Sequence, residues 1–367
     1  MEKQPNRRDF LRAATACGLA AALAPAMGAA PAAAKRNIRL GFDNFSIRGF
    51  GWKAPRLIEY AASLKVDVLL MSDLGVYESL DDAYLKKIRA QAEGAGLEIQ
   101  VGTGSICPTS KSFDAKKWGS ALEHLRLLIR VARATGSRVA RCYLGTMRDR
   151  EGDGGIERNI EETVKVCKAA RGEAVDAGVK IAIENHAGDM QAWELVSLIE
   201  SAGKDFVGAT MDCGNAPWVL EDPLVNLEHL GPYAVTTGMR DTAVWETENG
   251  ATALWANMGE GAVDWQAYVK RFQELCPGVA FVLEILSYIW PRELSYLDPK
   301  SWATYPKARA HEFARFVALA KRGKKGAPPA GRPTGERSAE LEQAQQKYDL
   351  EQSLAYCREI LGLGMRA

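Results

Sequence analysis

Short apolar segments alternate with amphipathic segments over most of the chain, between residues 37 and 322. The apolar segments that read as buried β-strands are residues 38–42, 66–71, 98–102, 138–143, 179–183, 207–211, 234–238 and 280–285. Segments with the apolar spacing of helices follow them at residues 55–64, 82–94, 118–134, 157–177, 190–202, 223–229, 264–275 and 307–321. This alternation predicts a parallel sheet covered by helices, and eight such units are the number that closes a (β/α)8 TIM barrel.

A doubly wound open sheet is the competing α/β architecture. It more often carries a Gly-x-Gly-x-x-Gly loop after the first strand, and the chain has none there. The sequence therefore predicts one barrel over residues 37–322. A Pro/Gly-rich linker, residues 323–337, and a C-terminal helix, residues 338–367, come after it. One stripe of that helix is apolar, so we expect it to pack against the barrel or a second subunit; the stripe is Leu350, Leu354, Cys357 and Leu361.

Residues 1–34 differ from the rest of the chain. Two adjacent arginines, Arg7 and Arg8, precede Phe10 and Leu11, and an alanine-rich apolar run follows. This pattern is typical of a twin-arginine signal peptide, so we expect export to the periplasm or otherwise out of the cytoplasm by the twin-arginine pathway. Because Pro25 interrupts a weakly apolar run, we expect no stable membrane anchor.

Composition narrows the class of partner. The 367 residues are 47% hydrophobic and 25% charged, which is enough apolar material for one large core or two smaller ones. The formal net charge is +1 and no basic cluster lies outside the termini, so we expect no nucleic-acid partner. The six cysteines beyond Cys17 are widely spaced without a Cys-x-x-Cys pair, which argues against a disulfide framework.

Polar residues stand at the ends of the later predicted strands. These are Glu184 and His186 after the fifth, Asp212 and Asn215 after the sixth, Arg240 and Asp241 after the seventh, and Glu284 in the eighth. In a barrel these ends converge on one face, where catalytic residues lie. Carboxylates that converge would repel one another unless a cation lay between them, so the pattern predicts a divalent metal. An oxygen-rich set favours Mn²⁺ or Mg²⁺, whereas coordination by His186 would suit Zn²⁺ or Co²⁺.

Four motifs carry a resemblance to a known family: "IENH" (183–186), "MDCGN" (211–215), "LEI" (283–285) and "MGEGAVDW" (258–265). With these motifs the chain, over most of residues 37–322, resembles the xylose-isomerase-like barrels, also called sugar-phosphate isomerase/epimerase-like proteins, which include the ketose 3-epimerases. The resemblance implies that Glu184, Asp212 and Glu284 bind a divalent metal and that the two glutamates also move protons. A homo-oligomer is likewise an expectation from the family.

The chain departs from the family at one ligand position. Many relatives read His-x-Lys/Arg-Asp at the seventh strand, whereas this chain reads Gly238-Met239-Arg240-Asp241. Three readings follow: the three carboxylates hold the metal with more water, His186 or Asp241 fills the place, or binding is weak. The site residues expected to bind metal are therefore Glu184, Asp212, Glu284 and Asp241.

The resemblance implies a reaction class. A metal would hold and polarise a keto-sugar, and Glu184 and Glu284 would remove and return a proton. We expect an isomerase or epimerase; the alternatives are a 3-keto-glycoside lyase or hydratase and a barrel that binds sugar without turnover. Export favours an unphosphorylated sugar or keto-sugar. A nuclease of this fold would use more histidine ligands, and the chain has only four histidines.

Further residues are candidates for orienting the carbohydrate: His186, Asn215, Arg240 and Asp43. For Arg240 the competing reading, which we favour, is an ion pair with Asp241. The aromatic residues expected in loops after the later strands are Trp218, Trp255, Tyr288 and Trp290, and the facing of Arg141 in the fourth strand is left open.

Overall fold

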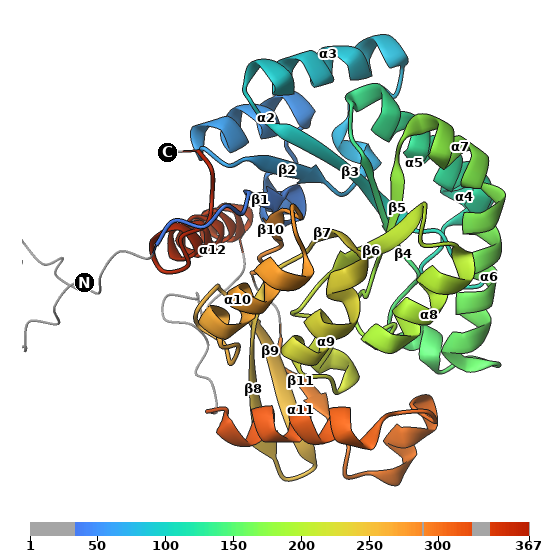
Figure 1. Cartoon of the computed structure of the whole chain (residues 1–367), viewed down its shortest axis with the longest axis vertical. Coiled ribbons are helices and arrows are strands. Elements are labelled where there is room, and N and C mark those ends of the chain that lie inside the picture. Colours follow the sequence, from blue (N-terminus) through green and yellow to red (C-terminus); the bar gives the residue numbers. More distant parts are fainter. Residues whose placement is uncertain (1–33, 288–289, 325–337, 367) are drawn as a thin grey trace, which may run out of the picture. The chain divides into compact units, whose positions relative to one another are not determined.

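The structure is a computed structural model, and it describes residues 34–287, 290–324 and 338–366. In these residues eight parallel strands form one sheet that curls into a barrel with helices around it (Figure 1). The predicted (β/α)8 TIM-barrel fold is confirmed. Its strands are β1 (Leu40–Asp43), β2 (Val68–Met71), β3 (Glu98–Ser105), β4 (Val139–Tyr143), β5 (Lys180–Glu184), β6 (Val207–Met211), β7 (Ala234–Thr237) and β10 (Phe281–Leu283).

The strand order shows how the barrel closes. Each of β1 to β6 pairs in parallel with the next strand, and β10 pairs in parallel with β1, Leu40 opposite Phe281. The remaining seam, between β10 and the end of β7, is bridged by Met239 and Leu283. Met239 N donates to the Val282 carbonyl at 2.7 Å, and Glu284 N donates to the Met239 carbonyl at 2.9 Å. These bonds place Gly238 to Arg240 beside the end of β10.

Amphipathic helices cover the outside of the barrel, where they bury apolar faces on the strands. In α5, for example, a capping box between Ser120 and Glu123 marks the start, and Gly136, with φ of 77°, marks the end. The helices are α2 (Ala54–Ser63), α3 (Asp82–Gly94), α4 (Ala115–Trp118), α5 (Ala121–Thr135), α6 (Gly155–Ala169), α7 (Arg171–Ala177), α8 (Ala192–Ala202), α9 (Pro223–Leu230), α10 (Trp265–Leu275), α11 (Ala310–Arg322) and α12 (Ala339–Glu359).

A second, antiparallel sheet was not predicted. It consists of β8 (Asp241–Thr247), β9 (Gly250–Ala256) and β11 (Arg292–Leu294), with β9 in the middle. Figure 1 shows this sheet next to α11, with which it shares a small apolar core that includes Val244, Leu294 and Phe316. Trp255 therefore lies in a strand, β9, and not in a loop as expected. Tyr288 lies outside the described residues, and Trp290 is exposed.

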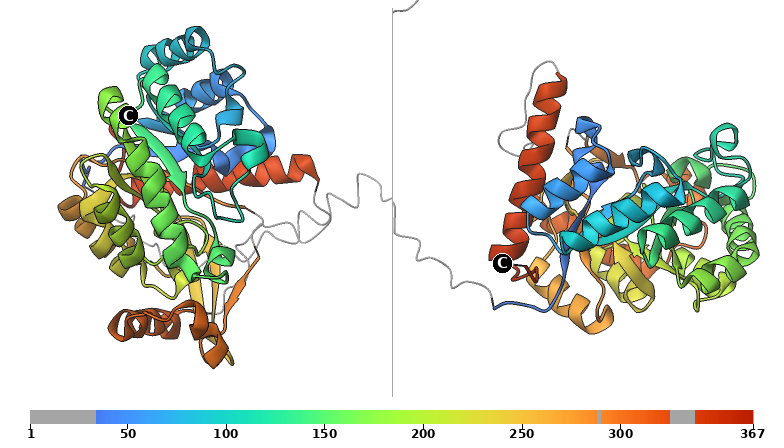
Figure 2. Two further views of the ribbon diagram at one scale, coloured as in Figure 1. Left: turned by 90° about the vertical axis from the view of Figure 1, so that its right-hand side faces the viewer. Right: turned by 90° about the horizontal axis from the view of Figure 1, so that it is seen from above.

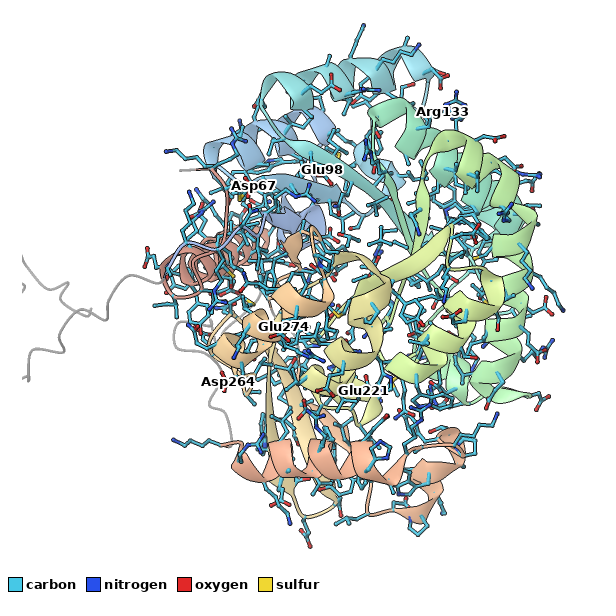
Figure 3. All side chains as sticks on the ribbon, in the orientation of Figure 1. Asp67, Glu98, Arg133, Glu221, Asp264 and Glu274 are labelled. Carbon is cyan, nitrogen blue, oxygen red and sulfur yellow. The ribbon has the colours of Figure 1, made fainter. Side chains whose placement is uncertain are left out.

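The C-terminal helix α12 packs against the barrel of its own chain. Figure 2 shows this helix, in red, along one side of the barrel. Its predicted apolar stripe is buried in the main core, and Gly49 N donates to Gln346 Oε1 at 2.8 Å. Beyond the opposite end of the helix lies Asp67, which is labelled in Figure 3. Met365 N and Leu40 N both donate to Asp67 Oδ2, at 2.9 and 2.8 Å. The segment after α12 is thereby hydrogen-bonded to the start of β2.

The described residues do not include the expected signal peptide, except for its last residue, Ala34, or most of the expected linker. In the part of the chain that is described, no helix is long and apolar enough to span a bilayer. The six cysteines of that part are buried free thiols.

Candidate active site

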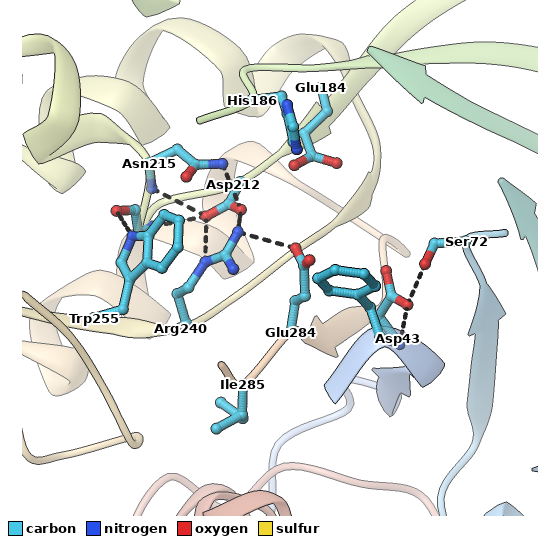
Figure 4. Close-up of polar contacts among 12 residues, drawn as sticks. Asp43, Ser72, Glu184, His186, Asp212, Asn215, Arg240, Trp255, Glu284 and Ile285 are labelled. Atoms are coloured by element: carbon cyan, nitrogen blue, oxygen red, sulfur yellow. Dashed lines mark hydrogen bonds and ion pairs between the residues drawn. The ribbon is translucent and has the colours of Figure 1, made fainter. Parts of the chain in front are cut away.

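Three carboxylates meet at the carboxyl ends of the barrel strands. Glu184 is the last residue of β5, Asp212 directly follows β6, and Glu284 directly follows β10. Each is buried and offers one oxygen, and these three oxygens all lie within 4.8 Å of one another (Figure 4). The structure thus brings together the three residues that the strand ends and the family resemblance singled out.

Two asparagines hold these strand ends in place. Asp212 N donates to Asn185 Oδ1 at 2.9 Å, and Asn185 Nδ2 donates to the Asp212 carbonyl at 2.7 Å, so one side-chain amide ties β5 to β6. Asn215 Nδ2 donates to Asp212 Oδ2 at 2.8 Å and to the Asn185 carbonyl at 2.9 Å. Because these groups are buried and hydrogen-bonded, the Asp212 carboxylate has a fixed orientation.

Arg240 lies between two of the three carboxylates (Figure 4). Its Nη2 donates to Glu284 Oε2 at 2.9 Å and also pairs with Asp212 Oδ2, while Nε lies 3.3 Å from Asp212 Oδ1. Only 2% of the side chain is exposed. The expected pairing with Asp241 is therefore wrong: Arg240 supplies positive charge to the carboxylate cluster.

The surroundings of Arg240 are shaped to hold its side chain. A Cβ on Gly214 would lie 2.1 Å from Arg240 Cγ, so only glycine leaves the space that the side chain occupies. The guanidinium carbon lies 4.5 Å from the ring centroid of Trp255, a cation–π contact. That ring stacks on Trp218 at 4.2 Å, and its Nε1 donates to the Gly214 carbonyl at 2.7 Å.

The third carboxylate has an arginine of its own. Arg141 Nε donates to Glu184 Oε2 at 2.6 Å, and its Nη1 donates to the Thr103 carbonyl at 3.1 Å. Burial lowers the pKa of Arg141, but Glu184, Glu284 and Asp43 outweigh that effect and raise it above its usual value. Arg141 in β4 thus faces the barrel interior and belongs to the site.

Two atoms of this cluster have no hydrogen-bond partner among the described residues. They are the acceptor Glu184 Oε1 and the donor Arg240 Nη1, and both are buried. Asn215 Oδ1 is a third such atom. Buried polar atoms without partners are rare because each costs about 1–3 kcal/mol. One donor and two acceptors are therefore available for hydrogen bonds with the carbonyl and hydroxyl groups of a ligand.

Asp43, at the end of β1, lies at the same end of the barrel. Its Oδ1 accepts from Ser72 Oγ at 2.5 Å and from Phe45 N at 2.8 Å. Burial, and next the charge of Glu284, raise the pKa of Asp43 to about 7. Near neutral pH this carboxyl can therefore accept a hydrogen bond from a hydroxyl or donate one to it.

His186 is held in one tautomer beside Glu184. Its ring stacks on Tyr143 with centroids 3.8 Å apart, and Nδ1 lies 2.7 Å from the Gly145 carbonyl oxygen. A carbonyl can only accept, so Nδ1 carries the proton and Nε2 keeps a lone pair. Burial, and next the charge of Arg141, lower the pKa of His186 to about 4, so the ring is neutral.

Asp241 is not part of the carboxylate cluster. Its oxygens accept from Trp265 Nε1 at 2.7 Å, from Gly259 N at 3.1 Å and from Val263 N at 3.3 Å. Burial raises the pKa of Asp241 to about 6. Asp241 therefore organises the "MGEGAVDW" segment before α10, and the expectation that it would serve as a metal ligand does not agree with its position.

The three carboxylates could hold a metal ion. They supply only oxygen ligands, as hard divalent cations prefer, and Glu184 Oε1 lacks a partner. A Cβ on Gly238 would lie 3.4 Å from both Asp212 Oδ2 and Glu284 Oε2, so a side chain at this position would face the same oxygens. The described arrangement, however, already has the Arg240 guanidinium on two of the three carboxylates.

A cavity of about 300 Å³ lies beside Ala187, the residue after His186. Its wall contains Trp218 and two basic residues, Lys111 and Arg148. This cavity is large enough for a small sugar derivative and carries positive charge.

Comparison with known proteins agrees with the barrel fold. Residues 58–303 match the family model of the xylose isomerase-like TIM barrels. Among curated proteins, the 3-oxo-isoapionate decarboxylase of Pectobacterium atrosepticum is 20% identical over 241 residues, which are 65% of this chain and 78% of the relative.

Solved structures share the fold at low identity. A D-psicose 3-epimerase, determined in the presence of D-fructose, has a TM-score of 0.58 and 16% identity, with 89% of this chain and 100% of the other covered. The IOLI protein with a bound zinc atom has a TM-score of 0.51 and 15% identity, with 77% of this chain and 95% of the other covered. A xylose isomerase-like TIM barrel protein from Mycobacterium smegmatis, in complex with magnesium, has a TM-score of 0.50 and 14% identity, with 77% of this chain and 97% of the other covered.

Proposed function

The chain belongs to the xylose isomerase-like TIM barrel family, and from its site we propose an enzyme that isomerises or epimerises a carbohydrate by proton transfer between carboxylates. The observation that carries the proposal is the buried cluster of Glu184, Asp212 and Glu284 at the carboxyl ends of the strands. Buried charges of like sign are costly, so three carboxylates held together in a buried site point to a role beyond folding. Two of them are glutamates, which can act as base and acid in proton transfer.

The reaction assigns a different role to each glutamate. One of them, as the carboxylate, takes the proton from the carbon next to the sugar carbonyl, and the electron pair of that C–H bond forms an enediolate. The other, as the acid, returns a proton to the opposite face of the same carbon or to the neighbouring carbon; in the second case the hydroxyl proton of the first carbon also moves to the former carbonyl oxygen. The first outcome is epimerisation and the second isomerisation. Glu184 and Glu284 come from β5 and β10, so they approach a substrate from different sides.

A positive charge must stabilise the oxygen of the enediolate. A divalent ion bound by the three carboxylates, or the Arg240 guanidinium that lies on two of them, would supply this charge. Oxygen-only ligands favour Mn²⁺ or Mg²⁺ for this place, while His186 with its free Nε2 would suit Zn²⁺ or Co²⁺. Barrels of the same fold hold zinc or magnesium, which supports a metal but does not select one.

The substrate that suits the site is an unphosphorylated sugar or keto-sugar. Acceptors for hydroxyl groups are present at Asn215 Oδ1 and His186 Nε2, and Asp43 adds a third polar group. The structural neighbours include a D-psicose 3-epimerase, a keto-sugar enzyme by its name. The twin-arginine pattern in residues 1–34 supports action in the periplasm, where sugar phosphates are scarce.

Deuterium incorporation tests this function. The protein is incubated in D₂O with a panel of ketohexoses, 3-keto-glycosides and keto-sugar acids, with Mn²⁺ and, in parallel, with EDTA. We expect one substrate to gain deuterium at carbon, and we expect Glu184→Gln and Glu284→Gln to slow this gain by about 100-fold or more. Glu221→Gln is the matched control, because Glu221 is a buried glutamate outside the cluster. Tight binding of a sugar without exchange would instead support a non-catalytic sugar-binding barrel.

Carbon–carbon or carbon–oxygen bond cleavage is the second candidate. The curated relative is a decarboxylase by name, and Lys111 and Arg148 in the neighbouring cavity suit an anionic substrate. In a 3-keto acid the bond to the carboxylate would break, CO₂ would leave, and the enolate would take a proton from a glutamic acid. In a 3-keto-glycoside one glutamate would instead take the proton from carbon 2, and the enolate so formed would expel the alkoxide at carbon 1, which takes up a proton from the other glutamic acid. Release of CO₂ or of the aglycone in the same panel distinguishes these reactions from epimerisation.

A further inference from the structure

We propose that Arg240 competes with a divalent ion for Asp212 and Glu284, and that the guanidinium is the occupant in the protein as it is. The inference deepens the proposed function, since it names the cation of the same site. It concerns binding alone and can be tested without a substrate.

The guanidinium and an ion would need the same atoms. Arg240 Nη2 bonds Glu284 Oε2 at 2.9 Å and pairs with Asp212 Oδ2. A side chain at position 238 would face these same two oxygens, because a Cβ there would lie 3.4 Å from each. The lone pairs that accept from Nη2 cannot bind a metal at the same time, and an ion held by the remaining lone pairs would lie close to the guanidinium charge. Occupation by one cation therefore opposes binding of the other.

The arginine is built into this place by several residues. Gly214 leaves the space for its Cγ, and Trp255 covers the guanidinium at 4.5 Å. Trp255 is itself fixed to Gly214 by a 2.7 Å hydrogen bond and backed by Trp218. The side chain is 2% exposed, so displacement by an ion would have to move a packed, buried cation. A chance contact of a surface arginine would need none of these features.

The absence of a histidine at position 238 and the presence of Arg240 both disfavour a divalent ion. With Gly238 the chain lacks a neutral fourth ligand, and with Arg240 it gains a fixed positive charge. Two arginines, Arg141 and Arg240, already pair with the three carboxylates. A divalent ion added to this set would meet two cations that are buried and cannot lose their protons.

Titration with Mn²⁺ tests the competition. Each protein in turn is added to a Mn²⁺ solution, and electron paramagnetic resonance follows the free aqueous ion. The proteins are wild type, Arg240→Met, Gly238→His and the double variant Gly238→His/Arg240→Met. We expect Arg240→Met to bind one ion per chain at least 100-fold more tightly than wild type, and the double variant to bind more tightly still. Arg150→Met is the matched control, since Arg150 is a buried arginine paired with Glu194 and does not contact the cluster. We expect its affinity to equal that of wild type.

Two results would overturn the proposal. One is wild-type binding of one Mn²⁺ within threefold of the affinity of Arg240→Met. The other is tight binding by Gly238→His alone, which keeps Arg240; this variant has ordinary contacts at its Cβ and remains informative if Arg240→Met does not fold. Because no substrate is used, neither result bears on the deuterium test of the proposed reaction, and failure of that reaction leaves the competition standing.

Discussion

Replacement of Gly214 by alanine should expel Arg240 from the carboxylate cluster without a change in any charge. The new methyl group would lie 2.1 Å from Arg240 Cγ, 2.8 Å from Cδ and 3.0 Å from Nε. Ordinary contact begins near 3.4 Å, so the arginine has to move by more than 1 Å. The Trp255 ring, which stacks on Trp218 and is hydrogen-bonded to Gly214, lies against the guanidinium and limits a small shift. The side chain then has to leave Asp212 and Glu284.

The loss in the free energy of unfolding follows from the overpacking and from the carboxylates that stay buried without their counter-ion. Overpacking by one methyl group costs about 1–3 kcal/mol when the neighbours can adjust. Loss of one partner from a buried ion pair costs about 3–5 kcal/mol because the other charge stays buried without compensation. We therefore expect Gly214→Ala to lower the free energy of unfolding by about 3–5 kcal/mol in buffer without divalent ions. Mn²⁺ at 100 times its dissociation constant should restore about 2.7 kcal/mol.

Urea unfolding followed by tryptophan fluorescence, with EDTA or with Mn²⁺, measures both values. Gly238→Ala is the control, since its methyl group would make only ordinary contacts in the same cluster. If Gly214→Ala were as stable as Gly238→Ala, to within about 1 kcal/mol, the reasoning on Arg240 would be refuted.

Two further predictions concern stability. Burial raises the pKa of Glu221 to about 8, so the folded state holds this proton to higher pH than the unfolded state, and stability falls as the pH rises from about 4 to 8. Glu221→Gln removes that fall, so its free energy of unfolding should gain on that of wild type between pH 5 and pH 8, by at most about 1.4 kcal/mol per pH unit in urea unfolding; parallel curves would contradict this. Asp349 of α12 accepts from Asn257, Gln345 and Ser287, at 3.0, 2.8 and 2.5 Å. Asp349→Ala leaves these donors unpaired, and urea unfolding should show a loss of about 2–4 kcal/mol, whereas a loss below 1 kcal/mol would mean that water replaces the carboxylate.

The barrel strands were predictable because buried parallel strands are short, nearly continuous apolar runs. The predicted segment 207–211 coincides with β6, and the others differ from the observed strands by a few residues at their ends. The sheet of β8, β9 and β11 was missed, since residues 241–256 mix polar and apolar positions between two clear units and were read as a connection. Its partner strand β11 lies far along the chain, so no local pattern indicates the pairing.

The carboxylates of the site were predictable from the strand ends, but their counter-ions were not. Arg240 stands next to Asp241 in the sequence, which suggested a pair. Neighbouring side chains in extended backbone point to opposite sides, so Arg240 turns toward Asp212 and Glu284 while Asp241 turns toward the segment before α10. Arg141 offered one signal, a lone arginine in the apolar strand β4, but the sequence does not show which face of the strand it occupies.

The central claim is that the carbohydrate reacts between Glu184 and Glu284. The most direct measurement is a crystal structure of Glu184→Gln with the sugar that shows deuterium exchange with the wild-type protein. The account predicts that the carbonyl carbon and its neighbour lie between residues 184 and 284, with a sugar oxygen within hydrogen-bond distance of Arg240 Nη1 or of an ion in its place. A sugar held in the cavity beside Ala187, which Trp218, Lys111 and Arg148 line, without contact to the three carboxylates, would contradict the account.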